Sequence, residues 1–225
     1  GDTGASWIGG DNAEEASIRL MDTNTAQVTP FEITTKLMEK ATENGANLRI
    51  ETVTGLEISE EEGSKVTGVH LESGETIPAD KVIIAMGPWS TKVQDWLGVR
   101  TPMTGIYSTS LVFTAEGNED VGAKIREEPR ALFCSEDRYG THLEVYPRSN
   151  GDIYVCGCGG SRYVSEEDLR KDQPAPGEEV ADPGRVKAAS ESLAALAPQV
   201  AKDRNPEVSQ ACMRPCPPDA MPMIG

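Results

Sequence analysis

The chain has 225 residues, a hydrophobic content of 37% and a formal net charge of −16 at pH 7. This composition is typical of a globular protein that can bury a core. The acidic excess disfavours nucleic acids and anionic membranes, because both are bound mainly through Lys and Arg. No apolar run approaches the roughly 20 residues that a membrane-spanning helix requires. Five cysteines without C-x-x-C spacing predict reduced thiols in a cytoplasmic protein, and they indicate neither a zinc site nor a disulfide framework.

The first hundred residues contain a helical segment and several β-rich ones. Apolar residues recur at helical spacing from Phe31 to Ala41, between an N-cap at Thr29 and a terminating Gly45, and they predict an amphipathic helix. Short β-rich segments follow at residues 47–50, 53–59, 65–71, 76–77 and 81–85. The last of these is continuously apolar at residues 82–85, a pattern typical of a strand buried on both faces of a parallel sheet.

A short helix near residues 91–96 precedes a change to β-rich sequence at about residue 101. Strands are expected at residues 107–113, 131–133, 142–146 and 152–156, with a hairpin turn at residues 149–152. Asp182-Pro183 begins a helix that Pro198 closes, and a last strand follows at residues 207–213. The elements therefore predict an α/β fold with a β-rich second domain.

Two glycine motifs invite comparison with nucleotide sites. Gly87 follows the apolar segment at residues 82–85, and a glycine at the end of a parallel strand brings bare backbone to the edge where α/β sheets bind nucleotides. A buried strand followed by a glycine turn explains the same residues without a ligand. Residues 157–160, Gly-Cys-Gly-Gly, have no capped helix after them, so we predict a strand exit there rather than a pyrophosphate turn.

Several segments, taken together, resemble one protein family. They are ADKVIIAMGPWS at residues 79–90, EVYPR at residues 144–148 and RPCPPDAMPMIG at residues 214–225. In order and spacing they resemble the D-amino-acid oxidase and glycine oxidase superfamily of FAD-dependent oxidoreductases, and in detail an uncharacterised fungal and plant subgroup of it. Thr29 and Arg214 depart from that subgroup, in which a His and an apolar residue are usual.

The resemblance implies a Rossmann-like, FAD/NAD(P)-binding fold of two domains that is incomplete at both ends. Residues 1–100 would belong to the FAD-binding domain, residues 101–206 would form the β-rich substrate domain, and residues 207–225 would be a return strand toward the FAD-binding domain. The G-x-G-x-x-G turn that holds the FAD pyrophosphate in relatives is not found in this sequence. We therefore expect an internal fragment that is inactive in isolation.

For the cofactor, the resemblance implies FAD. The backbone of Val53 would contact the adenine, and Ala85 and Gly87 would line the dinucleotide. The implied reaction is oxidation of the C–N bond of a small-molecule amine or amino acid, with hydride transfer to the flavin.

On the substrate side, the resemblance implies that Arg214 binds a carboxylate through two charge-assisted hydrogen bonds. Glu144 would pair with the substrate ammonium or shape the pocket. Period-2 alternation places His142, Glu144 and Tyr146 on one face of a strand, and the resemblance implies active-site side chains at the positions of His142 and Glu144. The structural alternatives are a surface arginine paired with Asp219, a solvated charge at Glu144 and an ordinary strand histidine. Cys156 is interpreted as a structural thiol.

Two other classes of function fit the sequence. The chain could be a non-catalytic module that binds a protein partner through its acidic surface, or a nucleotide-binding domain that uses no flavin. A G-x-G-x-x-G motif upstream in the parent reading frame favours the oxidoreductase over both alternatives.

Overall fold

The computed structural model describes residues 5–9, 19–60, 64–177 and 179–224. The chain divides into two compact units, which we call the large unit (residues 1–21 and 102–225) and the small unit (residues 22–101). No helix among the described residues is both long and apolar enough to cross a bilayer.

The small unit contains one long helix and a three-stranded antiparallel sheet of order β1-β2-β3. The long helix confirms the predicted one, and it begins at Pro30, a residue favoured at the first helical position. Gly45, at φ +95°, lets the chain leave the helix. The elements are α1 (Pro30–Glu43), β1 (Val53–Ile58), β2 (Val66–Leu71), β3 (Thr76–Pro78), the 3₁₀-helix η1 (Gly87–Lys92) and α2 (Val93–Leu97).

Two predicted strands of the small unit are wrong in this structure. Residues 47–50 and 81–85 form no strand, and Ile50 and Ile83 are 93% and 90% exposed. A buried parallel strand depends on hydrogen bonds to neighbouring strands. Within the described residues of the small unit, no strand pairs with either segment. The apolar composition of residues 82–85 was therefore not enough to predict a strand here.

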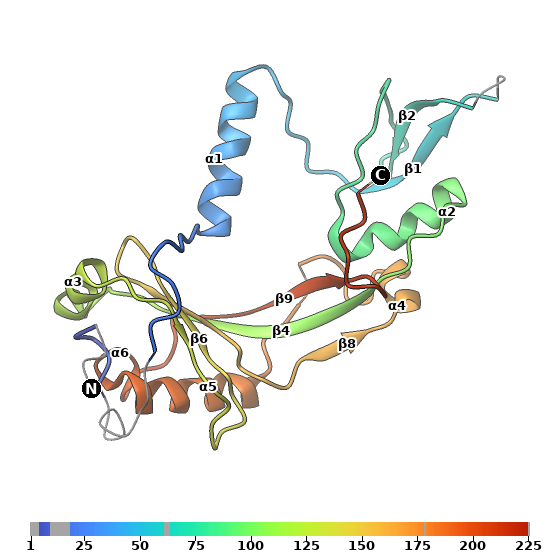
Figure 1. Cartoon of the computed structure of the whole chain (residues 1–225). Coiled ribbons are helices and arrows are strands. Elements are labelled where there is room, and N and C mark those ends of the chain that lie inside the picture. Colours follow the sequence, from blue (N-terminus) through green and yellow to red (C-terminus); the bar gives the residue numbers. More distant parts are fainter. Residues whose placement is uncertain (1–4, 10–18, 61–63, 178, 225) are drawn as a thin grey trace. The chain divides into compact units, whose positions relative to one another are not determined.

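The large unit is built on a six-stranded sheet whose central strand is β4. β7 and β8 pair in succession with one edge of β4, while β9 pairs along the other edge; β6 and β5 extend the sheet beyond β7 (Figure 1). Every pair is antiparallel. The strands are β4 (Thr104–Phe113), β5 (Leu132–Phe133), β6 (Glu144–Pro147), β7 (Ile153–Cys156), β8 (Arg162–Val164) and β9 (Val208–Cys216).

Four helices complete the large unit, namely α3 (Glu119–Glu127), α4 (Glu166–Arg170), α5 (Pro183–Leu196) and α6 (Pro198–Ala201). Asp182 caps α5 as predicted, because its carboxylate accepts the Arg185 N–H at 2.9 Å. α5 ends at Leu196, and Pro198, instead of only closing that helix, begins α6. The last strand extends three residues beyond its predicted end, to Cys216.

One face of this sheet, the apolar face, forms the core. Leu111, Val145 and Val155 lie opposite one another in register and are fully buried. They pack in one cluster with Leu193 of α5 and with Trp7, whose indole N–H donates to the Glu128 carbonyl at 2.9 Å. Residue 7 therefore belongs to the core of the large unit, and the strand of residues 208–216 belongs to its sheet. The assignment of these two segments to an FAD-binding domain stays a prediction.

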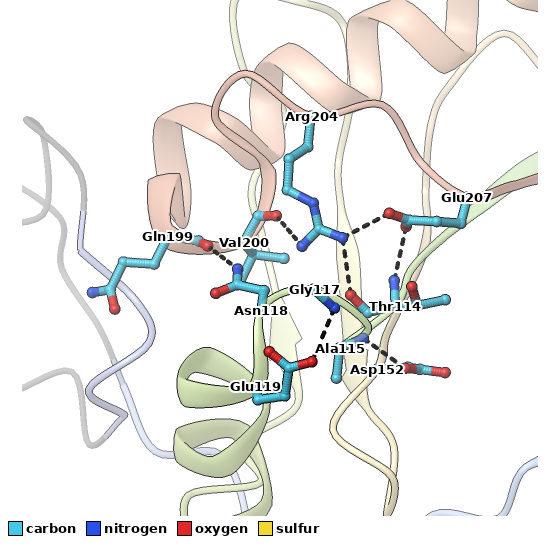
Figure 2. Close-up of polar contacts among 10 residues, drawn as sticks. All are labelled: Thr114, Ala115, Gly117, Asn118, Glu119, Asp152, Gln199, Val200, Arg204 and Glu207. Carbon is cyan, nitrogen blue, oxygen red and sulfur yellow. Dashed lines mark hydrogen bonds and ion pairs between the residues drawn. The ribbon is translucent and has the colours of Figure 1, made fainter.

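A polar cluster fastens the end of β4 to the segment that enters β9. The Arg204 guanidinium donates to the Thr114 carbonyl at 3.0 Å and to Glu207 at 2.6 Å, and Glu207 accepts the Thr114 N–H at 2.9 Å (Figure 2). Burial raises the pKa of Glu207, but these hydrogen bonds outweigh it and hold the pKa below its ordinary value. The cluster satisfies backbone groups where β4 ends.

A second polar cluster fastens the loop before β6 to α5. Asp137 accepts hydrogen bonds from the Tyr139 and Thr141 N–H groups and from the Ser192 hydroxyl, the last at 2.6 Å. Burial raises the pKa of Asp137, and the hydrogen bonds lower it by more, so the pKa lies below its ordinary value. The loop is therefore held against the helix that covers the apolar face.

The Gly-Cys-Gly-Gly motif is a strand exit, as predicted. It follows β7, and β8 rather than a helix comes after it. Gly157 lies at φ +72°, and a Cβ there would approach the His142 carbonyl oxygen to 2.2 Å. Arg185 donates to the Cys158 carbonyl at 2.6 Å and to the Gly140 carbonyl at 2.8 Å. The glycines thus allow close packing of protein backbone.

Candidate active site

The second face of the large sheet, the polar face, collects side chains from β5, β6, β7, β4 and β9. Residues opposite each other in an antiparallel pair share a face, and the registers place Phe133, Glu144 and Cys156 in one row across three strands. Tyr146 and Tyr154 form a neighbouring row. From β4 and β9, the same face receives Ser108, Ser110, Gln210, Cys212 and Arg214.

Glu144 is the centre of the polar face. This half-buried side chain accepts two hydrogen bonds on one oxygen, Oε2: the Tyr146 hydroxyl donates at 2.6 Å and the Cys156 thiol at 3.6 Å. The sequence predicted that Glu144 and Tyr146 share a strand face, and their hydrogen bond confirms this. Cys156 was interpreted only as a structural thiol, yet it is a partner of Glu144.

Both donors stay protonated at neutral pH. Burial, followed by the hydrogen bond to Glu144 and its charge, raises the pKa of Tyr146 far above its ordinary value. Burial, followed by the charge of Glu144, raises the pKa of the Cys156 thiol to about 12. Because a thiol is nucleophilic as the thiolate, Cys156 is a hydrogen-bond donor in this site and not a nucleophile.

Aromatic rings border the Glu144 carboxylate. The Tyr146 ring meets Phe133 edge-on at a centroid distance of 5.9 Å and lies 6.2 Å from Tyr154, and the Arg148 guanidinium lies 5.4 Å from the Tyr154 ring centre. Sequence reasoning did not select Phe133 or Tyr154. The signal was present for Tyr154, because the predicted hairpin at residues 149–152 places it opposite Tyr146.

Arg214 lies on β9 opposite Ile106, and its side chain is exposed. The proposed alternative partner, Asp219, instead accepts the Met221 N–H at 3.1 Å. Across the part of the chain that the structure describes, Arg214 forms no ion pair. Its charge nevertheless acts on this face, because it lowers the pKa of Cys156, opposing the larger raising effects of burial and Glu144.

His142 precedes β6 instead of lying within it. Its backbone N–H donates to the Gly157 carbonyl at 2.9 Å and its side chain is exposed. Leu143 and Val145 are buried on the apolar face, so alternation puts His142 on the side of Glu144. Within the described residues the imidazole has no hydrogen bond, so the structure does not join it to the Glu144 cluster.

The predicted cofactor residues lie in the small unit. Val53 is half-buried at the start of β1, whereas Ala85 and Gly87 are exposed. Gly87 has φ +56°, and a Cβ added to it would meet no atom within 4 Å. Accessible backbone at a position that favours glycine fits the edge of a dinucleotide site.

No group of residues able to hold a metal ion occurs in the described ranges.

Comparison with known proteins places these observations in a family. The family model described as FAD dependent oxidoreductase matches residues 5–225. Among solved structures, the L-amino acid deaminase from Proteus vulgaris is 16% identical with a TM-score of 0.62 over 85% of this chain. The glycine oxidase from Geobacillus kaustophilus is 17% identical with a TM-score of 0.61 over 86% of it.

A third solved structure, the glycerol-3-phosphate dehydrogenase from Bacillus halodurans complexed with FAD, is 18% identical with a TM-score of 0.54 over 82% of this chain. The likeness to these three proteins concerns the fold. This chain spans 50%, 44% and 34% of their respective lengths.

Proposed function

The chain belongs to the family of FAD dependent oxidoreductases, and we propose that it supplies the substrate-binding sheet of an enzyme that oxidises the C–N bond of an amine or amino acid. The observation that carries the proposal is that two opposite charges, Glu144 and Arg214, lie on the polar face of the large sheet without forming an ion pair among the described residues. On this face Glu144 is half-buried and Arg214 is exposed. Such a pair suits a zwitterionic substrate, whose ammonium binds the carboxylate and whose carboxylate binds the guanidinium.

The strand order sets how the two charges are arranged. Glu144 lies on β6 and Arg214 on β9, with β7 and β4 between them. Both charges act on the thiol of Cys156 on β7, because Glu144 raises its pKa and Arg214 lowers it. Three inter-strand steps of about 4.8 Å separate β6 from β9. The registers also place Arg214 four residues along β9 from Gln210, the residue level with Glu144 and Cys156, which adds about 13 Å along the strand. The long arginine side chain has to span part of this distance. The kcat/KM values of substrates that differ in the spacing between amine and carboxylate should therefore show which spacing the two side chains accommodate.

FAD, when bound, supplies the two-electron acceptor for the reaction. The residues of this chain bind and orient. We assign Val53, Ala85 and Gly87 to the cofactor. Ala85 and Gly87 are exposed, Gly87 has a φ of +56° that favours glycine, and Val53, which is half-buried, is assigned on the resemblance to the family alone. Glu144 and Arg214 are assigned to the substrate. His142 is assigned a place at the rim of the substrate site, where its exposed imidazole is accessible.

The test of the substrate assignment is Arg214→Leu in the full-length parent protein loaded with flavin, called the flavin-loaded protein below, because the isolated chain is expected to be inactive. We expect kcat/KM for an amino acid to fall about a hundredfold, roughly 3 kcal/mol, since two charge-assisted hydrogen bonds are lost. The rate with the matching amine that lacks the carboxylate should be unchanged. Arg162→Leu is the matched control, because Arg162 is also an exposed strand arginine but lies opposite Tyr107, in a row of the other face. Equal losses on both substrates would reject the carboxylate assignment.

The cofactor assignment is tested by Gly87→Val. A β-branched residue is strained at φ +56° and adds bulk to the accessible backbone. We expect flavin absorbance to be lost from the purified protein while circular dichroism stays close to wild type. Gly74→Val, at φ +87° in the turn between β2 and β3, controls for backbone strain alone. Full flavin occupancy in the Gly87 variant would overturn the assignment.

A further inference from the structure

We propose that Tyr146 and Cys156 are positioning residues that hold one oxygen of Glu144 and leave the other oxygen for a cationic amine. The proposal rests on the function proposed above. Both donors reach the same atom, Oε2, at 2.6 Å from the Tyr146 hydroxyl and 3.6 Å from the Cys156 thiol. In the described part of the chain, Oε1 has no hydrogen bond and no ion pair. An ionised carboxylate accepts hydrogen bonds on both oxygens, so Oε1 is the free acceptor.

The two donors come from a rigid part of the sheet. Tyr146 is two residues from Glu144 on β6, and Cys156 is the register partner of Glu144 on β7. The Tyr146 ring is itself held between Phe133 and Tyr154. A carboxylate fixed by groups on packed strands loses little conformational entropy when a ligand binds, which favours affinity.

The protonation of both donors fits this role. Because the pKa values of Tyr146 and Cys156 are raised, each donates a hydrogen bond to Glu144 across the pH range in which an amine is protonated. Neither residue is suited to take a proton from the substrate at neutral pH. Tyr146 and Cys156 therefore orient the Glu144 carboxylate and take no part in proton transfer.

The first arm of the test measures whether the effect of Tyr146 on amine binding depends on Glu144. In the flavin-loaded protein, Tyr146→Phe should raise KM for the amine about tenfold with a smaller change in kcat, because a hydrogen bond to a charged group is lost. In a Glu144→Gln background the same substitution should change KM little, since the carboxylate it orients is gone. Cys156→Ala should raise KM as well, and Cys156→Ser should recover part of that loss. Tyr107→Phe is the control, because it removes a hydroxyl on the other face of the sheet, which donates to the Val180 carbonyl at 2.8 Å.

The second arm does not depend on turnover. Alkylation of Cys156 by iodoacetamide, resolved from Cys158 by tandem mass spectrometry, is followed against pH in wild type and Glu144→Gln. Removing the negative charge should move the alkylation profile of Cys156 to lower pH. The other titratable or charged groups that interact with this thiol are Cys158, Arg214, Tyr146 and Tyr154, and all four are present in both proteins.

The outcomes separate the two proposals. If the wild-type flavin-loaded protein oxidises no amine, the proposed function is wrong, and so is the assignment of an amine to Oε1. The alkylation profile of Cys156 alone then decides whether Tyr146 and Cys156 position Glu144. If amines are oxidised but Tyr146→Phe raises KM equally in both backgrounds, the positioning role is overturned while the function stands. An alkylation profile that does not respond to Glu144→Gln overturns the hydrogen-bonded cluster.

Discussion

The two faces of the large sheet are made by the same strands and differ in what their side chains contact. On the apolar face, alternate residues of β4, β6 and β7 are fully buried against α5 and α6. On the polar face, Ser110 and Val112 of β4 are buried, whereas the residues that carry a carboxylate, a thiol, two tyrosine rings and a guanidinium are half-buried or exposed. The comparison teaches that one face can hold the fold together while the other remains available for a ligand.

The same division explains where polar groups are satisfied. Asp137 and Glu207 are used to fasten loops at the margins of the core, and their pKa values are lowered by the hydrogen bonds they accept. Glu144 lies on the polar face and keeps one oxygen without a partner among the described residues. Substitutions on the two faces should therefore change different measured quantities.

The largest effect is expected from truncating a phenylalanine on the apolar face. Phe113 is 1% exposed, and Phe113→Ala should lower the free energy of unfolding by about 3–5 kcal/mol through lost burial and a residual cavity. Phe133→Ala, on the polar face and 58% exposed, is the matched control and should cost about 1 kcal/mol. Denaturant unfolding measures both. Similar losses for the two variants would break the distinction between the faces.

A smaller effect is expected at the loop that α5 holds. Asp137→Ala leaves the Thr141 N–H and the Ser192 hydroxyl without their acceptor, so we expect the free energy of unfolding to fall by about 2 kcal/mol. Asp120→Ala, an exposed acidic residue in the first turn of α3, should cost no more than about 0.5 kcal/mol. Thermal unfolding of the pair checks the difference. A loss at Asp137 no larger than at Asp120 would show that the loop is not fastened by this carboxylate.

The smallest effect is expected at Glu207, and it depends on pH. The side chain is 38% exposed, so Glu207→Gln should cost only about 1 kcal/mol. Because the pKa is lowered in the folded state, its stabilisation is complete above the ordinary value of 4.5 and is lost as pH falls through the lowered folded-state pKa. Unfolding curves of wild type and variant should therefore converge in acid. A difference that persisted unchanged to the lowest pH would contradict the ionic origin of this contact.

Local patterns were sufficient for the elements that depend on nearby residues. Thr29 and Gly45 flank the first helix, although the Thr29 side chain accepts no capping hydrogen bond. The Asp182 cap begins α5, and the turn at residues 149–152 joins β6 and β7. These features depend on caps, periodicity and turn residues within a few positions of each other. Residues 82–85 show the opposite case, because an apolar run becomes a strand only where other strands pair with it.

The sequence by itself determined the alternation that puts Glu144 and Tyr146 on one side of a strand, the bounds of α1, the start of α5 and the resemblance to FAD-dependent oxidoreductases. It did not predict α3, α4 or α6. Only the tertiary structure decided that the Cys156 thiol donates to Glu144 and that Arg214 arrives on the same face from β9. The physical reason is register. Strand pairing and the burial of the apolar face decide which residues of distant strands lie opposite each other. Neither is encoded within a single segment.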